Sequence, residues 1–185
     1  MSNCYFIEEI KDTPCLKLET IYTKMHELEK SLNYKFNDIA NLANAMCAKK
    51  LNRDGSGGNS KDYYNSSLAT VGDAMLKSIL CEALFKQGLY KGDITKIKEK
   101  MENNKCLFQL SNKYNLNNYA FNEHGFYPDL NSNNSPPYST HDQYLEAIIG
   151  AVYFDSNYES CRLWVTKELF TSDKINKLIE DYRQK

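Results

Sequence analysis

The sequence predicts an all-α protein organised around a single domain. Apolar residues recur every three or four positions in successive segments, which is the spacing of one face of a helix. The alternation typical of strands is weak everywhere except within residues 4–18. No internal repeat is visible, and 185 residues suit one domain with its own core. We expect residues 19–185 to form one helical domain, preceded by an N-terminal extension over residues 1–18.

The N-terminal half is predicted to be helical over residues 19–32, 37–49 and 64–86. In the longest of these segments one face carries apolar side chains, which are Leu68, Val71, Met75, Ile79 and Ala83. Gly88 follows at a position suited to ending that helix. Residues 53–60 are rich in Gly, Ser and Asn and are expected to form a loop.

The C-terminal half is predicted to begin with helices over residues 93–101 and 105–114. Residues 115–138 are rich in Asn and include Pro136 and Pro137, so a long loop is expected there. Ser139 and Thr140 can cap a following helix that runs to about residue 154. The closing helices are expected over residues 158–170, with Trp164 and Leu169 as core anchors, and over residues 173–182.

Composition narrows the possible classes of function and location. Lys and Arg total 23 against 24 Asp and Glu, so net charge does not indicate a nucleic-acid partner, and any such role depends on local patches or a metal. The six cysteines form no C-x-x-C pair and there are only three histidines, which gives zinc binding little support. No apolar run is long enough for a membrane span, and no secretory signal is visible. We expect an intracellular protein, in the nucleus or cytoplasm, without a membrane partner.

Two carboxylates stand inside apolar, small-residue helical segments. They are Asp73, within residues 68–76, and Glu146, within residues 144–152. A carboxylate removed from water is stabilised by a cation, by hydrogen bonds or by a metal ion. Small neighbours let two helices approach closely, so the two acids can meet at a divalent-cation site. The simpler interpretations remain open: Asp73 can pair with Lys77 one turn later, and Glu146 can lie on a solvated helix face.

The residues around both acids resemble blocks of the ribonuclease III family. Residues 65–74, Asn-Ser-Ser-Leu-Ala-Thr-Val-Gly-Asp-Ala, are similar to the signature Asn-Glu-Arg-Leu-Glu-Phe-Leu-Gly-Asp-Ser/Ala. Residues 145–155 resemble the second block, in which Asp-x-x-Glu precedes Ala-Leu-Ile-Gly-Ala. Residues 92–95 and 102–107 resemble the Glu-Gly-x-Leu-Thr and Asn-Asn-Lys-x-Leu stretches between them. The blocks occur in the family's order, and the resemblance spans roughly residues 18–170.

The resemblance implies an all-helical, Mg²⁺-dependent endonuclease that cleaves double-stranded RNA and works as a homodimer. It implies 5′-phosphate products with short 3′ overhangs, and Mn²⁺ is expected to substitute for Mg²⁺. Asp73 and Glu146 match catalytic metal-binding acids of the two blocks. Within the basic residues of segment 89–103 and beyond, Lys98 and Lys105 are the expected RNA contacts, although such a mixed-charge run is usually just a solvated helix face.

Several positions depart from the family pattern. The signature's catalytic Glu is Ala69, and the second block's Asp is Gln143. Other departures are Ser66, Thr70 and Lys91, where the family has Glu, Phe and an acid. Asp142, four residues before Glu146, is a candidate replacement ligand, and Gln143 can still offer a neutral oxygen to Mg²⁺. The alternative is a catalytically degenerate member that binds double-stranded RNA or serves as a scaffold.

Overall fold

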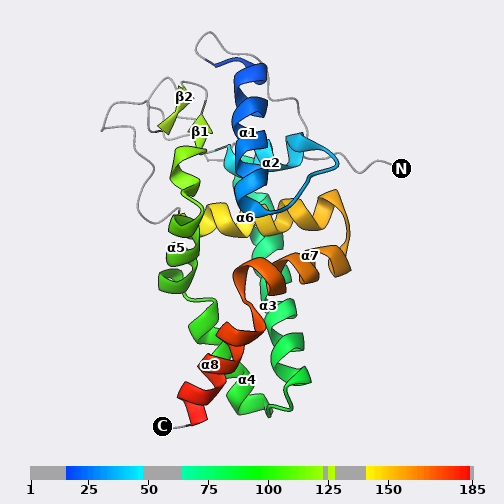
Figure 1. The fold of residues 1–185 in the computed structure, drawn as a ribbon, viewed down its shortest axis with the longest axis vertical. Helices are drawn as coiled ribbons and strands as arrows, with labels where there is room; N and C mark the ends of the chain where they lie inside the picture. Colours follow the sequence, from blue (N-terminus) through cyan, green and yellow to red (C-terminus); the bar gives the residue numbers. More distant parts are fainter. Residues whose placement is uncertain (1–15, 48–63, 123–124, 128–140, 184–185) are drawn as a thin grey trace.

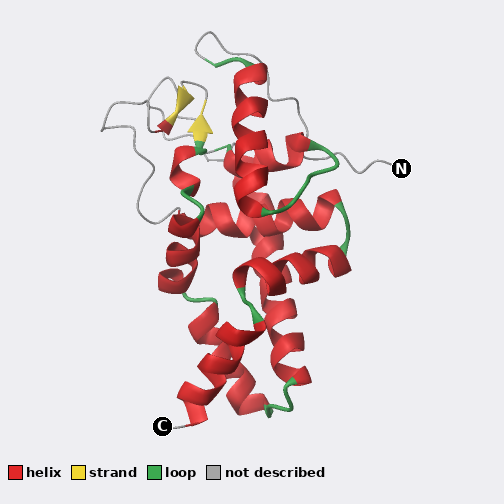
Figure 2. Cartoon of the chain, viewed as in Figure 1, coloured by secondary structure: helices red, strands yellow, loops and turns green. Residues whose placement is uncertain are grey.

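The computed structural model describes residues 16–47, 64–122, 125–127 and 141–183. Within these ranges the chain is almost entirely helical (Figure 2), which confirms the predicted all-α class. Across the same ranges, each helix is too short or too polar to cross a lipid bilayer.

The helices follow the predicted order along the chain (Figure 1). Their bounds are α1 (Leu18–Leu32), α2 (Ile39–Met46), α3 (Tyr64–Lys86), α4 (Lys91–Met101), α5 (Asn104–Lys113), α6 (His141–Asp155), α7 (Tyr158–Trp164) and α8 (Ser172–Arg183). The observed ends of α1, α3 and α8 lie within one residue of the expected ones. Local apolar spacing and capping residues are therefore sufficient to place these elements.

Helix α6 forms the centre of the core. It crosses α3 near the middle of the molecule (Figure 1) and also packs against α2 and α5. Its side chains are at most 1% exposed at seven positions, which are Tyr144, Leu145, Ala147, Ile148, Ile149, Ala151 and Val152. A helix that is apolar around most of its circumference is stable only when neighbouring elements cover it on several sides. Helices α2, α3, α5 and α7 accordingly cover α6.

Helix ends are set by residues that tolerate a left-handed backbone or that cap free amides. Asn33 follows α1 with φ +50° and Gly88 follows α3 with φ +75°, the latter at the predicted position. The Asn103 side chain accepts a hydrogen bond from the Cys106 amide at the start of α5, and Asn157 accepts one from the Ser160 amide at the start of α7.

The described part of the expected loop over residues 115–138 contains regular secondary structure, contrary to the prediction. It contains the 3₁₀ turn η1 (Leu116–Asn118) and the antiparallel strands β1 (Phe121–Asn122) and β2 (Gly125–Phe126). Phe121 and Phe126 lie opposite each other and are both buried, with ring centroids 5.5 Å apart. Strands this short show no alternation in sequence, and their stability comes from this buried aromatic pair. The loop over residues 53–60 and the Ser139–Thr140 cap lie outside the described residues, as does the expected strand-like segment up to residue 15. Its last residues, 16–18, are not a strand, because Leu18 already begins α1.

The predicted helix over residues 158–170 changes form halfway. After α7 the chain makes a π-helical turn, η5 (Val165–Leu169), in which the Phe170 amide donates to the Val165 carbonyl at 2.9 Å. The wider turn places residues five apart on one side, so Trp164 and Leu169 are both buried, as predicted for core anchors. The Trp164 indole donates to the Leu32 carbonyl at 2.8 Å and ties this region to the end of α1.

Candidate functional site

Two glycines allow α3 and α6 to touch through their backbones. A Cβ added to Gly72 would stand 1.8 Å from the carbonyl oxygen of Glu146 and 2.8 Å from the amide nitrogen of Gly150. Contacts this short exclude any side chain at position 72 unless the helices separate. The crossing is therefore closer than ordinary helix packing permits.

This crossing determines where the two predicted metal-binding acids lie. Asp73 directly follows Gly72 in α3, and the Glu146 backbone rests against Gly72 itself. Asp73 is 36% exposed, and Glu146 is partly buried. Two acids separated by 73 positions in the sequence thus flank one helix crossing at the edge of the core.

Asp73 carries a partner from its own helix. The Lys77 ammonium donates a hydrogen bond to Asp73 Oδ2 at 2.7 Å, which is the ion pair that the simpler interpretation anticipates. This hydrogen bond is the main cause of a raised pKa for Lys77; partial burial opposes it, and the charges of Asp73, Glu102 and Glu146 add to it. The Lys77 ammonium is therefore within electrostatic reach of acids from three different elements.

Glu102 is a carboxylate that the sequence analysis missed. It follows α4 as its C-terminal cap, and its side chain is 17% exposed. Its Oε1 accepts a hydrogen bond from Lys98 Nζ at 2.8 Å, whereas its Oε2 is buried and accepts none from the described residues. A buried carboxylate oxygen without a donor is unfavourable unless a cation supplies the missing interaction. The only signal in the sequence is its position just before Asn103, and acids mixed with lysines there are typical of a solvated face.

The other predicted site residues lie on α4, α5 and α6. Gln143 is in the first turns of α6, and its Nε2 lies 3.4 Å from Oδ1 of Asn65, a buried residue near the start of α3. Asp142 belongs to the first turn of α6, but its side chain lies outside the described part of the structure. Lys105 is exposed in the first turn of α5, whereas Lys98 is 18% exposed and paired with Glu102.

The residues at the crossing fit a hard divalent cation. Among the described side chains, no three His, Cys, Asp or Glu gather closely enough to share one metal ion. Mg²⁺ does not need such a group, because it commonly keeps several waters and uses one or two carboxylates together with substrate phosphate. The carboxylate oxygens of Asp73 and Glu146 match this preference, and a tetrahedral Cys/His zinc site has no counterpart in the described ranges.

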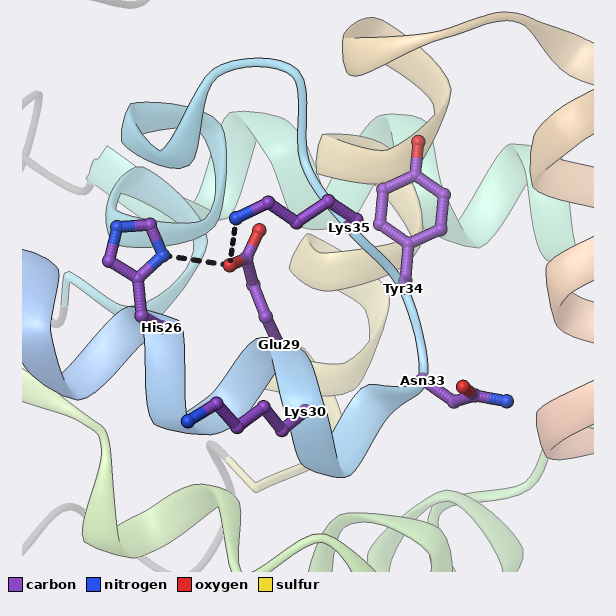
Figure 3. Close-up of a pocket in the computed structure, with 6 residues that line it drawn as sticks. All are labelled: His26, Glu29, Lys30, Asn33, Tyr34 and Lys35. Atoms are coloured by element: carbon purple, nitrogen blue, oxygen red, sulfur yellow. Dashed lines mark hydrogen bonds and ion pairs between the residues drawn. The ribbon is translucent and has the colours of Figure 1, made fainter.

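A surface hollow of about 610 Å³ lies elsewhere, against the end of α1 (Figure 3). Its lining consists of His26, Glu29, Lys30, Asn33, Tyr34 and Lys35, none of which is a predicted site residue. Glu29 is only 5% exposed and accepts hydrogen bonds from His26 Nδ1, Lys35 Nζ and the Phe36 amide at 2.8, 3.0 and 2.7 Å. Burial acts to raise the Glu29 pKa, but these hydrogen bonds together lower it below the usual value. The carboxylate is satisfied, and its role is to hold the connection between α1 and α2.

Comparison with known proteins gives a consistent picture. The family model for the ribonuclease III domain matches residues 66–157, a range that includes both Asp73 and Glu146. The protein named Ribonuclease 3 of Campylobacter jejuni is 28% identical over 166 residues, which cover 87% of this chain and 69% of that protein. Ribonuclease 3 of Fusobacterium nucleatum is 31% identical over 148 residues, which cover 77% of this chain and 60% of the relative. Both relatives are bacterial, so they give the nuclear alternative no support.

A solved structure shows the same fold. The nuclease domain of ribonuclease III from Campylobacter jejuni superposes with a TM-score of 0.63 at 26% identity, covering 85% of this chain and 96% of that domain. That structure is described as flexible in a region involved in dimer formation. The match covers a larger share of this chain than residues 66–157, to which the family model aligns.

Proposed function

Since the chain belongs to the ribonuclease III family, we propose that it is a Mg²⁺-dependent endonuclease that cleaves double-stranded RNA. Membership of the family supports endoribonuclease activity on double-stranded RNA in general. We propose in addition that the metal is Mg²⁺, that named residues of this chain hold it, and that the products carry 5′-phosphates and short 3′ overhangs.

One observation carries the proposal. The backbone contact between Gly72 and Glu146 brings Asp73 and Glu146, which are distant in sequence, to the same crossing. The glycines at positions 72 and 150 have no conformational need of a positive φ, because both lie within helices. Glycine is needed at these positions because the backbones of α3 and α6 approach closely there. A site assembled from two helices needs the same close approach.

Each residue at the crossing has a separate role in the proposal. Asp73 and Glu146 hold Mg²⁺, Gln143 offers a neutral oxygen, and Asp142 is a further candidate ligand. A bound Mg²⁺ supplies an activated water and offsets the charge that develops on the attacked phosphate. Ala69 leaves no acid one turn before Asp73, and two well-placed carboxylates still fall within the number that Mg²⁺ ordinarily uses. We therefore expect weaker metal binding than a fuller carboxylate set would give.

Substrate binding and assembly complete the proposal. Lys105, exposed at the start of α5, contacts an RNA phosphate, and Lys98 adds positive charge from the end of α4. Such contacts set affinity without reading the base sequence, as expected for recognition of A-form RNA by shape. We further propose a homodimer, so that two copies present one site to each strand. Sedimentation of the purified chain as a monomer at micromolar concentration would contradict this part.

The decisive assay incubates purified protein with long double-stranded RNA and Mg²⁺. Asp73→Asn and Glu146→Gln are expected to lower the cleavage rate by about a hundredfold or more while RNA binding persists, because each removes a charge that holds the metal. Glu99→Gln is the matched control, because Glu99 is exposed on α4. The Glu99→Gln protein should cleave RNA at the wild-type rate. Wild-type protein that leaves the RNA intact at excess enzyme would refute the proposal.

A specific observation also favours a second candidate, a degenerate member that only binds double-stranded RNA. Asp73 and Glu102 are each paired with a lysine of the same chain, so part of the acidic charge is already neutralised. In that case Asp73→Asn and Glu146→Gln should alter neither cleavage, which is absent, nor RNA affinity. The same assay therefore separates the two candidates.

A further inference from the structure

Lys77 differs from the lysine of an ordinary helix-surface ion pair, because the charges of more than one acid act on it. It bonds to Asp73 of α3 at 2.7 Å, and the charges of Glu102, at the end of α4, and Glu146, on α6, also act on it. These acids come from three elements, of which α3 and α6 cross beside Asp73. The Lys77 ammonium is thus the cation already present at the place where the proposed function requires a metal.

The ion pair also has a direct effect on the proposed ligand. The Asp73 oxygen that accepts from Lys77 is one of only two oxygens that this carboxylate can offer to a metal. A divalent ion held by Asp73 and Glu146 would lie beside the Lys77 ammonium, and like charges at such separations repel each other strongly. Both side chains are accessible, at 46% for Lys77 and 36% for Asp73, so the lysine has a route into solvent.

We propose that Lys77 is a built-in competitor of the divalent cation, whose ammonium must leave Asp73 before the metal binds. This inference rests on the proposed metal site and assigns a residue that sets its affinity. In the metal-free protein Lys77 stabilises the ionised Asp73. In the metal-bound protein it turns outward, and the cost of breaking its ion pair lowers the affinity for metal.

The same helix provides a matched control. Lys86 pairs with Glu82 through the same four-residue spacing and is also exposed, but it lies more than two turns beyond Lys77 toward the end of α3. Removal of either lysine deletes one charge and one helix-surface ion pair. Only removal of Lys77 deletes a charge from the crossing.

The test measures Mn²⁺ binding to the purified full chain by electron paramagnetic resonance of the free ion. Lys77→Met is expected to bind Mn²⁺ roughly fivefold more tightly than wild type. This gain in affinity corresponds to the free energy of one exposed ion pair, which metal binding no longer has to break. Lys77→Arg, which keeps the charge, and Lys86→Met should retain the wild-type affinity. As a second measure, saturating Mn²⁺ should raise the melting temperature of Lys77→Met more than that of wild type.

The outcomes distinguish this inference from the proposed function. Equal or weaker Mn²⁺ binding by Lys77→Met overturns the inference, and the metal site itself survives that result if Asp73→Asn and Glu146→Gln still weaken binding. Tighter binding that disappears when Glu146→Gln is added to Lys77→Met supports both. Mn²⁺ binding that is insensitive to all of these substitutions overturns both.

Discussion

Gly150 lies so close to Leu68 that a Cβ on Gly150 would stand 2.3 Å from the Leu68 carbonyl oxygen. The contact is the counterpart, one turn away, of the contact between Gly72 and Glu146. Neither can be relieved by a flexible side chain, since the opposing atoms belong to the backbone. The geometry of the candidate site therefore depends on two residues that take no part in chemistry.

Substitution of Gly72 by Ala should destabilise the protein and disrupt the site together. The added methyl group forces α3 and α6 apart, and we expect a loss of about 3 kcal/mol in the free energy of unfolding. That loss corresponds to a fall of roughly 6–12 °C in melting temperature for a chain of this size, measurable by circular dichroism. Gly92→Ala is the control, because nothing lies within 4 Å of its added Cβ. A Gly72→Ala protein as stable as wild type would contradict the described crossing.

Asp155 should be a major contributor to stability although it lies near the surface. Its carboxylate accepts hydrogen bonds from the Asn37 and Asp38 amides at 2.9 Å, from Asn41 Nδ2 at 3.0 Å and from the Tyr34 hydroxyl at 3.2 Å. Asp155→Ala leaves these donors without their acceptor, and we expect a loss of about 2–4 kcal/mol in urea unfolding. Asp181→Ala, an exposed acid on α8, should change stability by less than about 0.5 kcal/mol. A similar small change in Asp155→Ala would show that these bonds contribute little.

Glu29 should make stability depend on pH in the acidic range. Because its pKa in the folded protein lies below the ordinary 4.5, the ionised form stabilises the fold, and this contribution is complete above that value. As the pH falls below 4.5 and through the lowered folded-state pKa, the contribution is lost. Glu29→Gln should therefore be less stable than wild type at pH 7, and the difference should shrink below pH 4.5. Glu27→Gln, an exposed change on the same helix, should not reproduce this convergence, and a pH-independent difference for Glu29→Gln would contradict the assignment.

Cys161 should resist alkylation in the native protein. Burial raises the pKa of its thiol to about 12, and its Sγ donates to the Ile149 carbonyl at 3.6 Å. At pH 8 the thiol is therefore neutral and covered, whereas Cys81 and Cys106 are partly exposed. Brief treatment with iodoacetamide followed by peptide mass spectrometry should find Cys161 unmodified until urea is added. Modification of Cys161 as fast as Cys81 would show that α7 opens readily.

Much of the fold could be predicted because helix formation depends on nearby residues. The bounds of α1 and α3 and the breaker Gly88 depend on local features, and the structure reproduces them closely. The apolar face predicted for α3 is confirmed only in part, because Leu68 and Ile79 are buried whereas Val71, Met75 and Ala83 are half-buried. The fully buried residues of α3 include Leu76, Leu80 and Leu84, which the prediction did not name. The π-helical turn η5 and the strands β1 and β2 were not predicted. Each is stabilised by contacts that the apolar spacing of a helix or strand does not predict, such as Phe121 with Phe126 and Trp164 with Leu32.

The sequence by itself determined the helical class and the family resemblance, and it predicted the two candidate acids at positions 73 and 146, because these follow from short local patterns. Tertiary structure decided that those acids flank one helix crossing, since the crossing depends on two glycine backbones in contact. It also decided that Lys77 bonds to Asp73 while the charges of Glu102 and Glu146 act on it, and that one buried oxygen of Glu102 has no donor among the described residues. The interaction between two charges depends on their separation in space. Residues far apart along the chain come close to one another only when the chain folds.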